Sequence, residues 1–288
     1  MIGRPASRSA GVSRRKFLGL ASATVGLLSG GGIRRVWGGS QGRRLRSDDP
    51  DVLSPFERLH FPVLRLPVVT TNGAKVPVVV EMSHPMESVH YISNLHVVNE
   101  RDPVPSKGMF HLTPANGQVY LAFQARIDHG VSEVSVTAEC NVHGRWSSTQ
   151  SVNIPDGAGG CAAPAPPPRQ TTRDEILPPR IRIPQLVKGG RIRPDEIIDV
   201  QLMMRHPNRT GLALRNGRFV QESEPFYLQE MAVFYGAERV SRFAMTSALG
   251  DDPFITFRLR ARRKEPLRVV LTNSRGQRFE ATHPMHPS

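Results

Sequence analysis

An internal duplication limits the folds that this chain of 288 residues can adopt. The segments 62–67 (PVLRLP) and 179–184 (PRIRIP) resemble each other, and further along Val78–Pro85 aligns with Val200–Pro207. Between these segments each copy places a glycine and a proline at the same spacing, namely Gly73 and Pro77 in the first and Gly190 and Pro194 in the second. Two units of roughly 100 residues are too long for a solenoid repeat, so the pattern predicts two related domains.

Both copies carry the hydrophobic patterns of short β-strands. From Val134 to Val142 apolar residues alternate with polar ones, which is typical of a strand buried on one face. Asn216-Gly217 and Ser274-Arg275-Gly276 predict hairpin turns. Other strands are predicted at 76–80, 91–98, 119–127, 197–204, 227–235, 254–259 and 267–272. The interpretation is an all-β fold with one β-sandwich in each copy.

A segment rich in glycine, alanine and proline joins the two copies. Gly157, Gly159 and Gly160 precede Cys161, and the tract Pro164-Ala-Pro-Pro-Pro168 follows it. Such a composition predicts a flexible arm, with the glycines as its hinge and an extended proline part. We therefore expect the Cys161 thiol to be mobile and exposed, which suits a covalent carrier.

The resulting division of the chain has four parts. Residues 1–45 are a signal and disordered segment, 46–154 the first sandwich, 155–178 the arm, and 179–288 the second sandwich.

The two cysteines leave three interpretations open. In an oxidising compartment Cys140 and Cys161 can form a disulfide. Alternatively, Cys140 is a small hydrophobe on the apolar face of its strand, and Cys161 is a free carrier thiol. In the third interpretation Cys161 is an incidental residue of the linker.

The N-terminus carries an export signature. The run Ser13-Arg-Arg-Lys-Phe-Leu18 matches the twin-arginine motif, and the apolar run 18–28 that follows is too short to span a membrane. We expect export to the periplasm by the twin-arginine route and no membrane span afterwards. A basic amphipathic helix is the alternative.

Charge outside this leader does not favour nucleic-acid binding. The formal net charge is +13, but residues 1–46 hold ten basic residues and no acid, which leaves 28 basic and 25 acidic residues in the remainder. A remainder at +3 is close to balance, so no nucleic-acid partner is expected.

Known catalytic and metal motifs are missing from the sequence. It contains no Cys-x-x-Cys pair, Gly-x-Ser-x-Gly elbow, phosphate loop or dinucleotide fingerprint. We therefore predict no metal, no cofactor and no active site. His84 and His206, each before a proline, are expected to shape turns, with ligand or partner contact as the alternative. The tail His283-Pro-Met-His286 offers copper ligands, although a disordered terminus is the preferred interpretation.

The sequence resembles the SoxYZ sulfur carriers, with the two subunits fused. Residues from about 61 to 161 resemble SoxY, and residues from about 179 to 282 resemble SoxZ. The SoxY-like segments are Asn72-Gly73, Ser83-His84-Pro85-Met86, 110–117 (FHLTPANG) and Gly159-Gly160-Cys161. The SoxZ-like segments are Arg205-His206-Pro207, Thr210-Gly211-Leu212, 227–234 (YLQEMAVF) and 252–258 (DPFITFR). The fusion is similar to carriers associated with quinoprotein dehydrogenases.

The resemblance implies immunoglobulin-like sandwiches in both halves, paired with each other. It also implies that Cys161 holds sulfur intermediates covalently and presents them to Sox-type enzymes, or to a quinoprotein dehydrogenase and a c-type cytochrome. Here Ala162 and Ala163 replace the glycines that follow the family's cysteine, and the arm continues into the second domain. A non-covalent docking module for the dehydrogenase or cytochrome is the alternative, and copper delivery is a third interpretation.

Overall fold

A computed structural model describes residues 43–44, 53–157, 159–162, 175–187, 189–262 and 264–285. The predicted export signature, the proline tract 164–168 and His286 lie outside these residues. In the part of the chain that is described, no helix is both long and apolar enough to cross a membrane.

Nearly all regular structure is β, as predicted. The first copy contains β2 (Val63–Arg65), β3 (Val76–Met82), β4 (Ile92–Val98), β5 (Ser106–His111), β6 (Val119–Ala125), β7 (Gly130–Cys140) and β8 (Gly144–Ile154). The second contains β9 (Arg180–Arg182), β10 (Glu196–Met203), β11 (Leu212–Arg215), β12 (Arg218–Gln221), β13 (Leu228–Tyr235), β14 (Glu238–Met245), β15 (Phe254–Ala261), β16 (Leu267–Asn273) and β17 (Arg278–His283). Short elements complete the described chain, namely β1 (Arg43–Arg44), α1 (Pro55–His60), α2 (Pro184–Val187) and 3-10 turns at Gly73–Lys75 and Pro114–Asn116.

Each copy forms a β-sandwich, which confirms the predicted fold class. In the first, the sheet β8-β7-β4-β5 packs on β2-β3-β6, and in the second, β14-β13-β16-β17 packs on β15-β10-β9. Side chains alternate between buried and exposed along β3 and β7, because successive residues of a strand point to opposite faces. The inward residues of all these strands form one apolar core.

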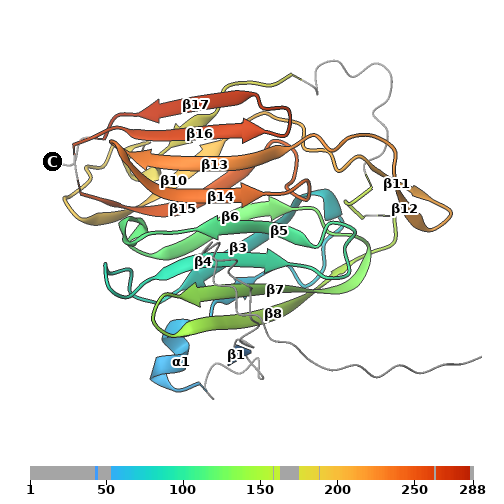
Figure 1. Ribbon diagram of the computed structural model, residues 1–288, viewed down its shortest axis with the longest axis horizontal. Helices are drawn as coiled ribbons and strands as arrows, with labels where there is room; N and C mark the ends of the chain where they lie inside the picture. The colour runs from blue at the N-terminus through green and yellow to red at the C-terminus, as the bar shows by residue number, and fades with distance from the viewer. Residues whose placement is uncertain are drawn as a thin grey trace, which may run out of the picture. The chain divides into compact units, whose positions relative to one another are not determined.

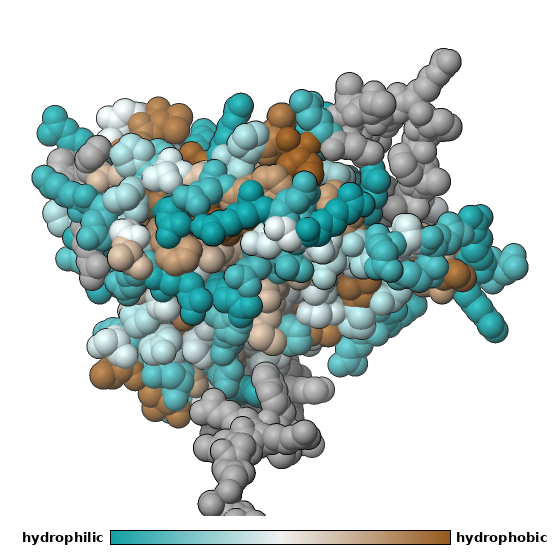
Figure 2. Space-filling view, turned by 45° about the horizontal axis from the view of Figure 1, so that its top comes forward, coloured by the Kyte–Doolittle hydropathy of each residue, from teal (hydrophilic) through white to brown (hydrophobic). Residues whose placement is uncertain are grey.

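The two sandwiches share their sheets. Antiparallel pairing of β5 with β14 and of β6 with β15 joins the strands into a nine-stranded and a six-stranded sheet (Figure 1). The face shown in Figure 2 carries mainly hydrophilic residues, with hydrophobic ones in small separate groups. Most of the large apolar side chains lie instead in the shared core.

The duplication in the sequence appears as a pseudo-two-fold arrangement. The repeated segments form β2 and β9 and then β3 and β10, and the later strands follow in the same order. Equivalent strands meet at the junction, since β5 pairs with β14 and β6 with β15. Such pairing of like with like is the isologous interface of a two-fold dimer, built here within one chain. The hairpin β11–β12 is an insertion of the second copy, and its turn lies at the predicted Asn216-Gly217.

Four phenylalanines fill the core of the junction. Phe110 of β5 and Phe243 of β14 lie opposite each other, with ring centroids 5.2 Å apart. Each also contacts a second ring of its own sandwich, Phe123 at 5.2 Å and Phe257 at 5.6 Å. Rings tilted or edge-on at these distances are favourable aromatic contacts.

A polar network seals the edge of the same junction. Asn116 Nδ2 donates to Ser241 Oγ and to the Arg258 carbonyl oxygen, both at 2.9 Å. Thr113 Oγ1 donates to the Val240 carbonyl oxygen at 2.8 Å. Because these groups are largely buried, separating the sandwiches would leave them without partners.

We expect Phe243→Ala to destabilise both sandwiches together by about 3–5 kcal/mol, because it leaves a cavity in their common core. The measurement is urea unfolding in a Trp37→Phe background, so that fluorescence reports on Trp146, which is buried in β8 of the first sandwich. Circular dichroism and fluorescence should give one shared transition at a lower urea midpoint. Phe219→Ala, on the hairpin outside both sandwiches, is the control and should shift the midpoint less. Two separate transitions in the wild-type protein would contradict a shared core.

Candidate functional site

Cys161 is buried where the first sandwich meets the second. Its relative exposure is 0%. The Gly160 amide donates to the Ile127 carbonyl oxygen at 2.9 Å, and Thr210 Oγ1 donates to the Cys161 carbonyl oxygen at 2.7 Å. We call residues 159–162 the seated segment. The predicted exposure of the thiol is therefore wrong for this conformation, because hydrogen bonds to a main-chain carbonyl of the first sandwich and from a side-chain hydroxyl of the second hold the segment in place.

Arg126 ties the seated segment to the second sandwich. One guanidinium nitrogen, Nη1, donates to the Gly160 carbonyl oxygen at 3.0 Å, and Nη2 donates to the Asn208 carbonyl oxygen at 2.7 Å. Nη2 also forms an ion pair with Asp251 at 3.0 Å. One buried side chain thus links the segment to both sides of the junction.

Two of the glycines before Cys161 permit close packing. A Cβ on Gly160 would lie 2.1 Å from the Gly73 carbonyl oxygen, and one on Gly159 would lie 2.6 Å from Asp128 Oδ1. Gly157 differs, since its φ is +79° and nothing lies within 4 Å of its Cβ position. The sequence predicts a hinge at all three glycines, and their flexibility stays a prediction. The seated conformation requires glycine at position 160, because a side chain there would collide with the backbone of Gly73, which cannot move aside as a flexible side chain could.

The surroundings of Cys161 keep its thiol protonated. The pKa of the thiol is raised to about 12, mainly by burial. The charges nearby add to this shift, because the Asp102 and Asp128 carboxylates raise the pKa by more than Lys107 and Arg126 lower it. Lys107 and Asp102 form a fully buried ion pair at 2.5 Å, and Asp102 Oδ1 also accepts from the Asp128 amide at 2.9 Å. Since the thiolate is the nucleophile, Cys161 is unreactive near neutral pH while the segment is seated.

The Cys140–Cys161 disulfide does not fit this fold. Both cysteines are free, and they lie at opposite ends of β7. The seated segment bonds to Ile127, just before β7 begins, whereas Cys140 is its last residue. Ten residue steps at about 3.3 Å each put the two sulfurs roughly 30 Å apart, and a disulfide needs its Cα atoms within about 7 Å.

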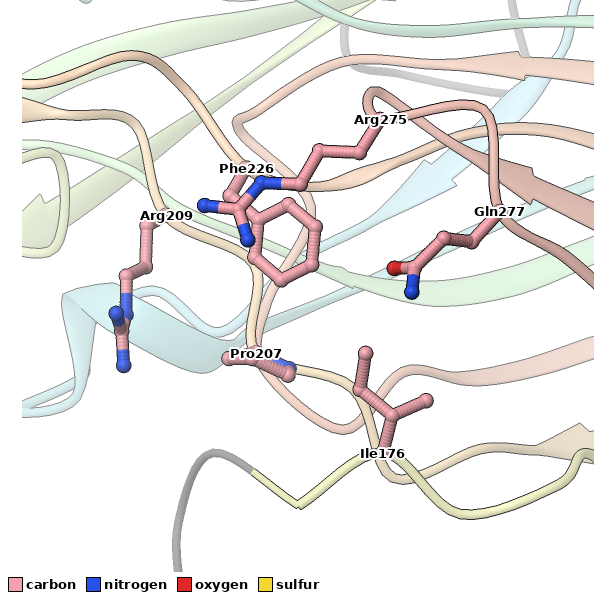
Figure 3. A pocket seen from close by; sticks show the side chains of 6 residues that line it. All are labelled: Ile176, Pro207, Arg209, Phe226, Arg275 and Gln277. Atoms are coloured by element: carbon pink, nitrogen blue, oxygen red, sulfur yellow. The ribbon is translucent and has the colours of Figure 1, made fainter. Parts of the chain in front are cut away.

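A cavity of about 200 Å³ lies on the second sandwich. It is lined by Ile176, Pro207, Arg209, Phe226, Arg275 and Gln277. Two of its lining residues, Pro207 and Arg209, are sequence neighbours of Asn208 and Thr210, which take part in holding the seated segment. Figure 3 shows Arg275 reaching across the face of the Phe226 ring, with 4.1 Å from its Cζ to the ring centroid. The two arginines and the absence of a carboxylate among these lining residues give the cavity a positive wall.

The two histidines that precede prolines are both buried but differ in their partners. His206 Nδ1 bonds to Asn208 Oδ1 and its Nε2 to Asn273 Nδ2, both at 3.2 Å. His84 Nδ1 bonds to the Pro85 carbonyl oxygen at 2.6 Å, which fits the predicted turn, while its Nε2 is buried without a hydrogen-bond partner among the described residues. Burial is the main cause that lowers the pKa of His84 to about 4, so this imidazole is neutral at physiological pH.

The group of side chains around His84 is not among the sites predicted from the sequence. Four residues converge on this histidine: His60 at the end of α1, His90 in the turn before β4, Cys140 at the end of β7 and His143 in the turn that follows β7. The spacing Cys140-x-x-His143 and the five residues between His84 and His90 are the signals that could have found it. Without the fold, nothing brings His60 to the other four.

We expect Gly160→Ala to expose Cys161, because the added methyl group collides with the Gly73 backbone. Alkylation of Cys161 by iodoacetamide at pH 8, followed by peptide mass spectrometry, measures this. A thiol with a pKa of about 12 instead of the usual 9.0 has on the order of 10³ less thiolate, so the rate can rise by up to that factor. Gly157→Asn is the control and should leave the rate close to that of the wild type, because Asn tolerates the positive φ of +79° and nothing lies within 4 Å of the Cβ position. Equal rates in all three proteins would contradict the seated conformation.

The alkylation rate of Cys161 in the wild-type protein should keep rising about tenfold per pH unit beyond pH 9, up to about 12. Burial of the protonated thiol stabilises the seated segment fully below pH 9, the ordinary thiol pKa, and this contribution is lost as the pH rises from 9 to 12. The pH profile of the rate, read on the same peptide, tests this. A plateau that begins at pH 9 would mean that the thiol is solvated. Gly160→Ala should show that plateau.

Comparison with known proteins identifies both halves of the chain. The family model described as sulfur oxidation protein SoxY matches residues 61–161, and that described as sulphur oxidation protein SoxZ matches residues 188–284. No curated protein sequence matches the chain.

Among solved structures, the E23A variant of a superoxide reductase (neelaredoxin) from Ignicoccus hospitalis is similar at 20% identity and a TM-score of 0.29, over 34% of this chain and 82% of that one. A Thermotoga maritima protein described as a superoxide reductase gives 22% and 0.30, over 36% and 92%. Likenesses this weak carry no conclusion about function. The two family matches together cover both sandwiches and end the SoxY part at Cys161, so the chain belongs to the SoxYZ family of sulfur-oxidation proteins, with SoxY-like and SoxZ-like domains fused and paired in one polypeptide.

Proposed function

We propose that this protein is a periplasmic carrier that holds sulfur intermediates covalently on Cys161 and presents them to oxidising enzymes, without an active site of its own for that chemistry. The observation that carries the proposal is the position of Cys161. It is the last residue of the SoxY match and lies at the junction with the SoxZ-like domain, whereas Cys140 lies at the far end of β7. The twin-arginine motif supports the periplasmic location.

Loading of the thiol is an oxidation. When a thiol joins the outer sulfur of thiosulfate, an S–S bond forms, and one proton and two electrons leave. A c-type cytochrome partner accepts the electrons in two one-electron steps, and the thiol proton goes to water. Later enzymes then act on the carried sulfur, and the thiol is regenerated for the next cycle.

Opening of the seated segment precedes this chemistry. Main-chain groups of Gly160 and Cys161 accept or donate the hydrogen bonds that hold it, so it can leave without altering a strand of either sandwich. The empty carrier keeps its thiol buried and protonated, which protects it from oxidation outside the cycle. A docked partner would stabilise the open segment.

The enzymes that bind the carrier decide whether it serves thiosulfate oxidation or a quinoprotein dehydrogenase pathway.

The burial of Cys161 favours a second candidate function, in which the paired domains dock a quinoprotein dehydrogenase or cytochrome without covalent chemistry. A buried thiol with a pKa of about 12 would then simply be part of the domain junction.

The covalent role predicts a reducible adduct on Cys161. We would measure the intact mass of the full-length protein from the periplasm of cells that oxidise thiosulfate, before and after reductant, with peptide mapping. Sulfur or sulfonate adducts are expected on the wild type and on Cys140→Ser, and loss of both adduct and substrate oxidation on Cys161→Ser. Full oxidation by cells that carry Cys161→Ser, with unchanged co-purification of the partner, would establish the docking function instead.

A further inference from the structure

Five side chains at one end of the SoxY-like domain point their nitrogen and sulfur atoms at one another. We call His60, His84, His90, His143 and Cys140 the histidine cluster. One ligand atom from each of His60, His84, His90 and Cys140 can be chosen so that all four lie within 4.8 Å of one another. His143 Nδ1 lies 2.9 Å from His60 Nε2, 3.2 Å from His90 Nε2 and 3.7 Å from Cys140 Sγ.

Backbone carbonyls fix the protonation of two of these imidazoles. His60 Nδ1 donates to the Phe56 carbonyl oxygen at 2.7 Å, and His84 Nδ1 donates to that of Pro85 at 2.6 Å, because a carbonyl can only accept. Their Nε2 atoms therefore present lone pairs to the cluster. Metal-ligating histidines are oriented in this way, with the other ring nitrogen bonded to a carbonyl or carboxylate.

The contacts at the centre of the cluster cannot all be hydrogen bonds at the same time. His143 Nδ1 can supply one proton, yet His60 Nε2, His90 Nε2 and Cys140 Sγ all lie around it. His84 is only 3% exposed, and its Nε2 has no hydrogen-bond partner among the described residues. Leaving a buried polar atom without a partner is unfavourable, and a bound cation would remove this cost.

The equivalent corner of the SoxZ-like domain is an internal comparison. There His206 corresponds to His84, Phe226 precedes β13 as His90 precedes β4, and Asn273 ends β16 as Cys140 ends β7. His206 has partners on both nitrogens, one of them Asn273. In the SoxZ-like domain, where Phe226 and Asn273 stand in place of His90 and Cys140, both nitrogens of the histidine have hydrogen-bond partners. The missing partner of His84 Nε2 is therefore a property of the histidine cluster and not of the fold.

We propose that the histidine cluster binds one divalent first-row transition-metal ion, through Nε2 of His60, His84 and His90, Nδ1 of His143 and the thiolate of Cys140. Imidazole and thiolate ligands exclude magnesium and calcium, which prefer oxygen. Five donors exceed the four of a tetrahedral zinc site and suit an ion with five or six ligands, such as ferrous iron. Metal–ligand bonds of about 2.1–2.3 Å place opposite donors about 4.2–4.6 Å apart. The ligand atoms of the cluster, which lie within 4.8 Å of one another, are spaced closely enough for this.

The surroundings make this a solvent-accessible centre held by a rigid frame. Helix α1 begins with a Ser54 capping box and a proline, and it ends on His60. The His60 ring packs on Trp146 with centroids 4.8 Å apart, and on Phe56 at 4.3 Å. His143 is exposed, so the ion can be reached from water on that side. Since Cys140 lies roughly 30 Å from Cys161, the metal centre is separate from the carrier thiol.

The test is an anaerobic titration of the reduced, metal-free full-length protein with Co²⁺. One ion should bind per chain, with a thiolate-to-cobalt charge-transfer band in the near ultraviolet. Cys140→Ser should lose this band, and His143→Ala, a change at an exposed turn position, should weaken binding at least tenfold. Cys161→Ser and His129→Ala are the controls, and both should bind as the wild type does.

Elemental analysis of the protein as isolated gives a second readout, with close to one iron or other first-row metal per chain expected. Absence of the charge-transfer band in the wild type would overturn the proposal. So would its loss in Cys161→Ser with retention in Cys140→Ser. Either result would leave the carrier function untouched, because that function is read from adducts on Cys161.

Discussion

The pairing of equivalent strands at the domain junction is the interaction on which the rest of the structure depends. Joining β5 to β14 and β6 to β15 turns two small sandwiches into one body with a common core. In a two-subunit carrier the same contact would depend on protein concentration. The fusion makes it intramolecular, so the junction forms at a high effective concentration set by the linker.

The junction also decides the environment of the Cys161 thiol. Cys161 is buried because the first domain supplies Arg126 and the Ile127 carbonyl while the second supplies Thr210. Neither domain alone provides all of these partners. The buried position of Cys161 thus depends on both domains, which gives the SoxZ-like half a structural role in holding the seated segment.

The same place in the two pseudo-symmetric domains has different chemistry. Each domain has a histidine followed by a proline just after equivalent strands, β3 in the first and β10 in the second. In one domain that histidine joins other imidazoles and a thiol, and in the other it bonds to asparagines beside an arginine-lined cavity. The strands therefore determine where these two regions lie, and a few differences in side chains determine what each region can bind.

The sequence by itself determined the duplication, the β-sandwiches and the hairpin at Asn216-Gly217, because strand periodicity, turn residues and motif spacing are local properties. It also singled out Cys161 as the candidate carrier residue, a role that stays a prediction. Tertiary structure decided what is non-local. It buried a thiol that a glycine-rich context predicted to be exposed, since Gly160 serves a close approach to Gly73, 87 positions earlier in the chain. It also brought His60 to Cys140, at the far end of the same domain's sequence. No pattern in the sequence encodes such contacts, because they depend on which strands become neighbours in the folded chain.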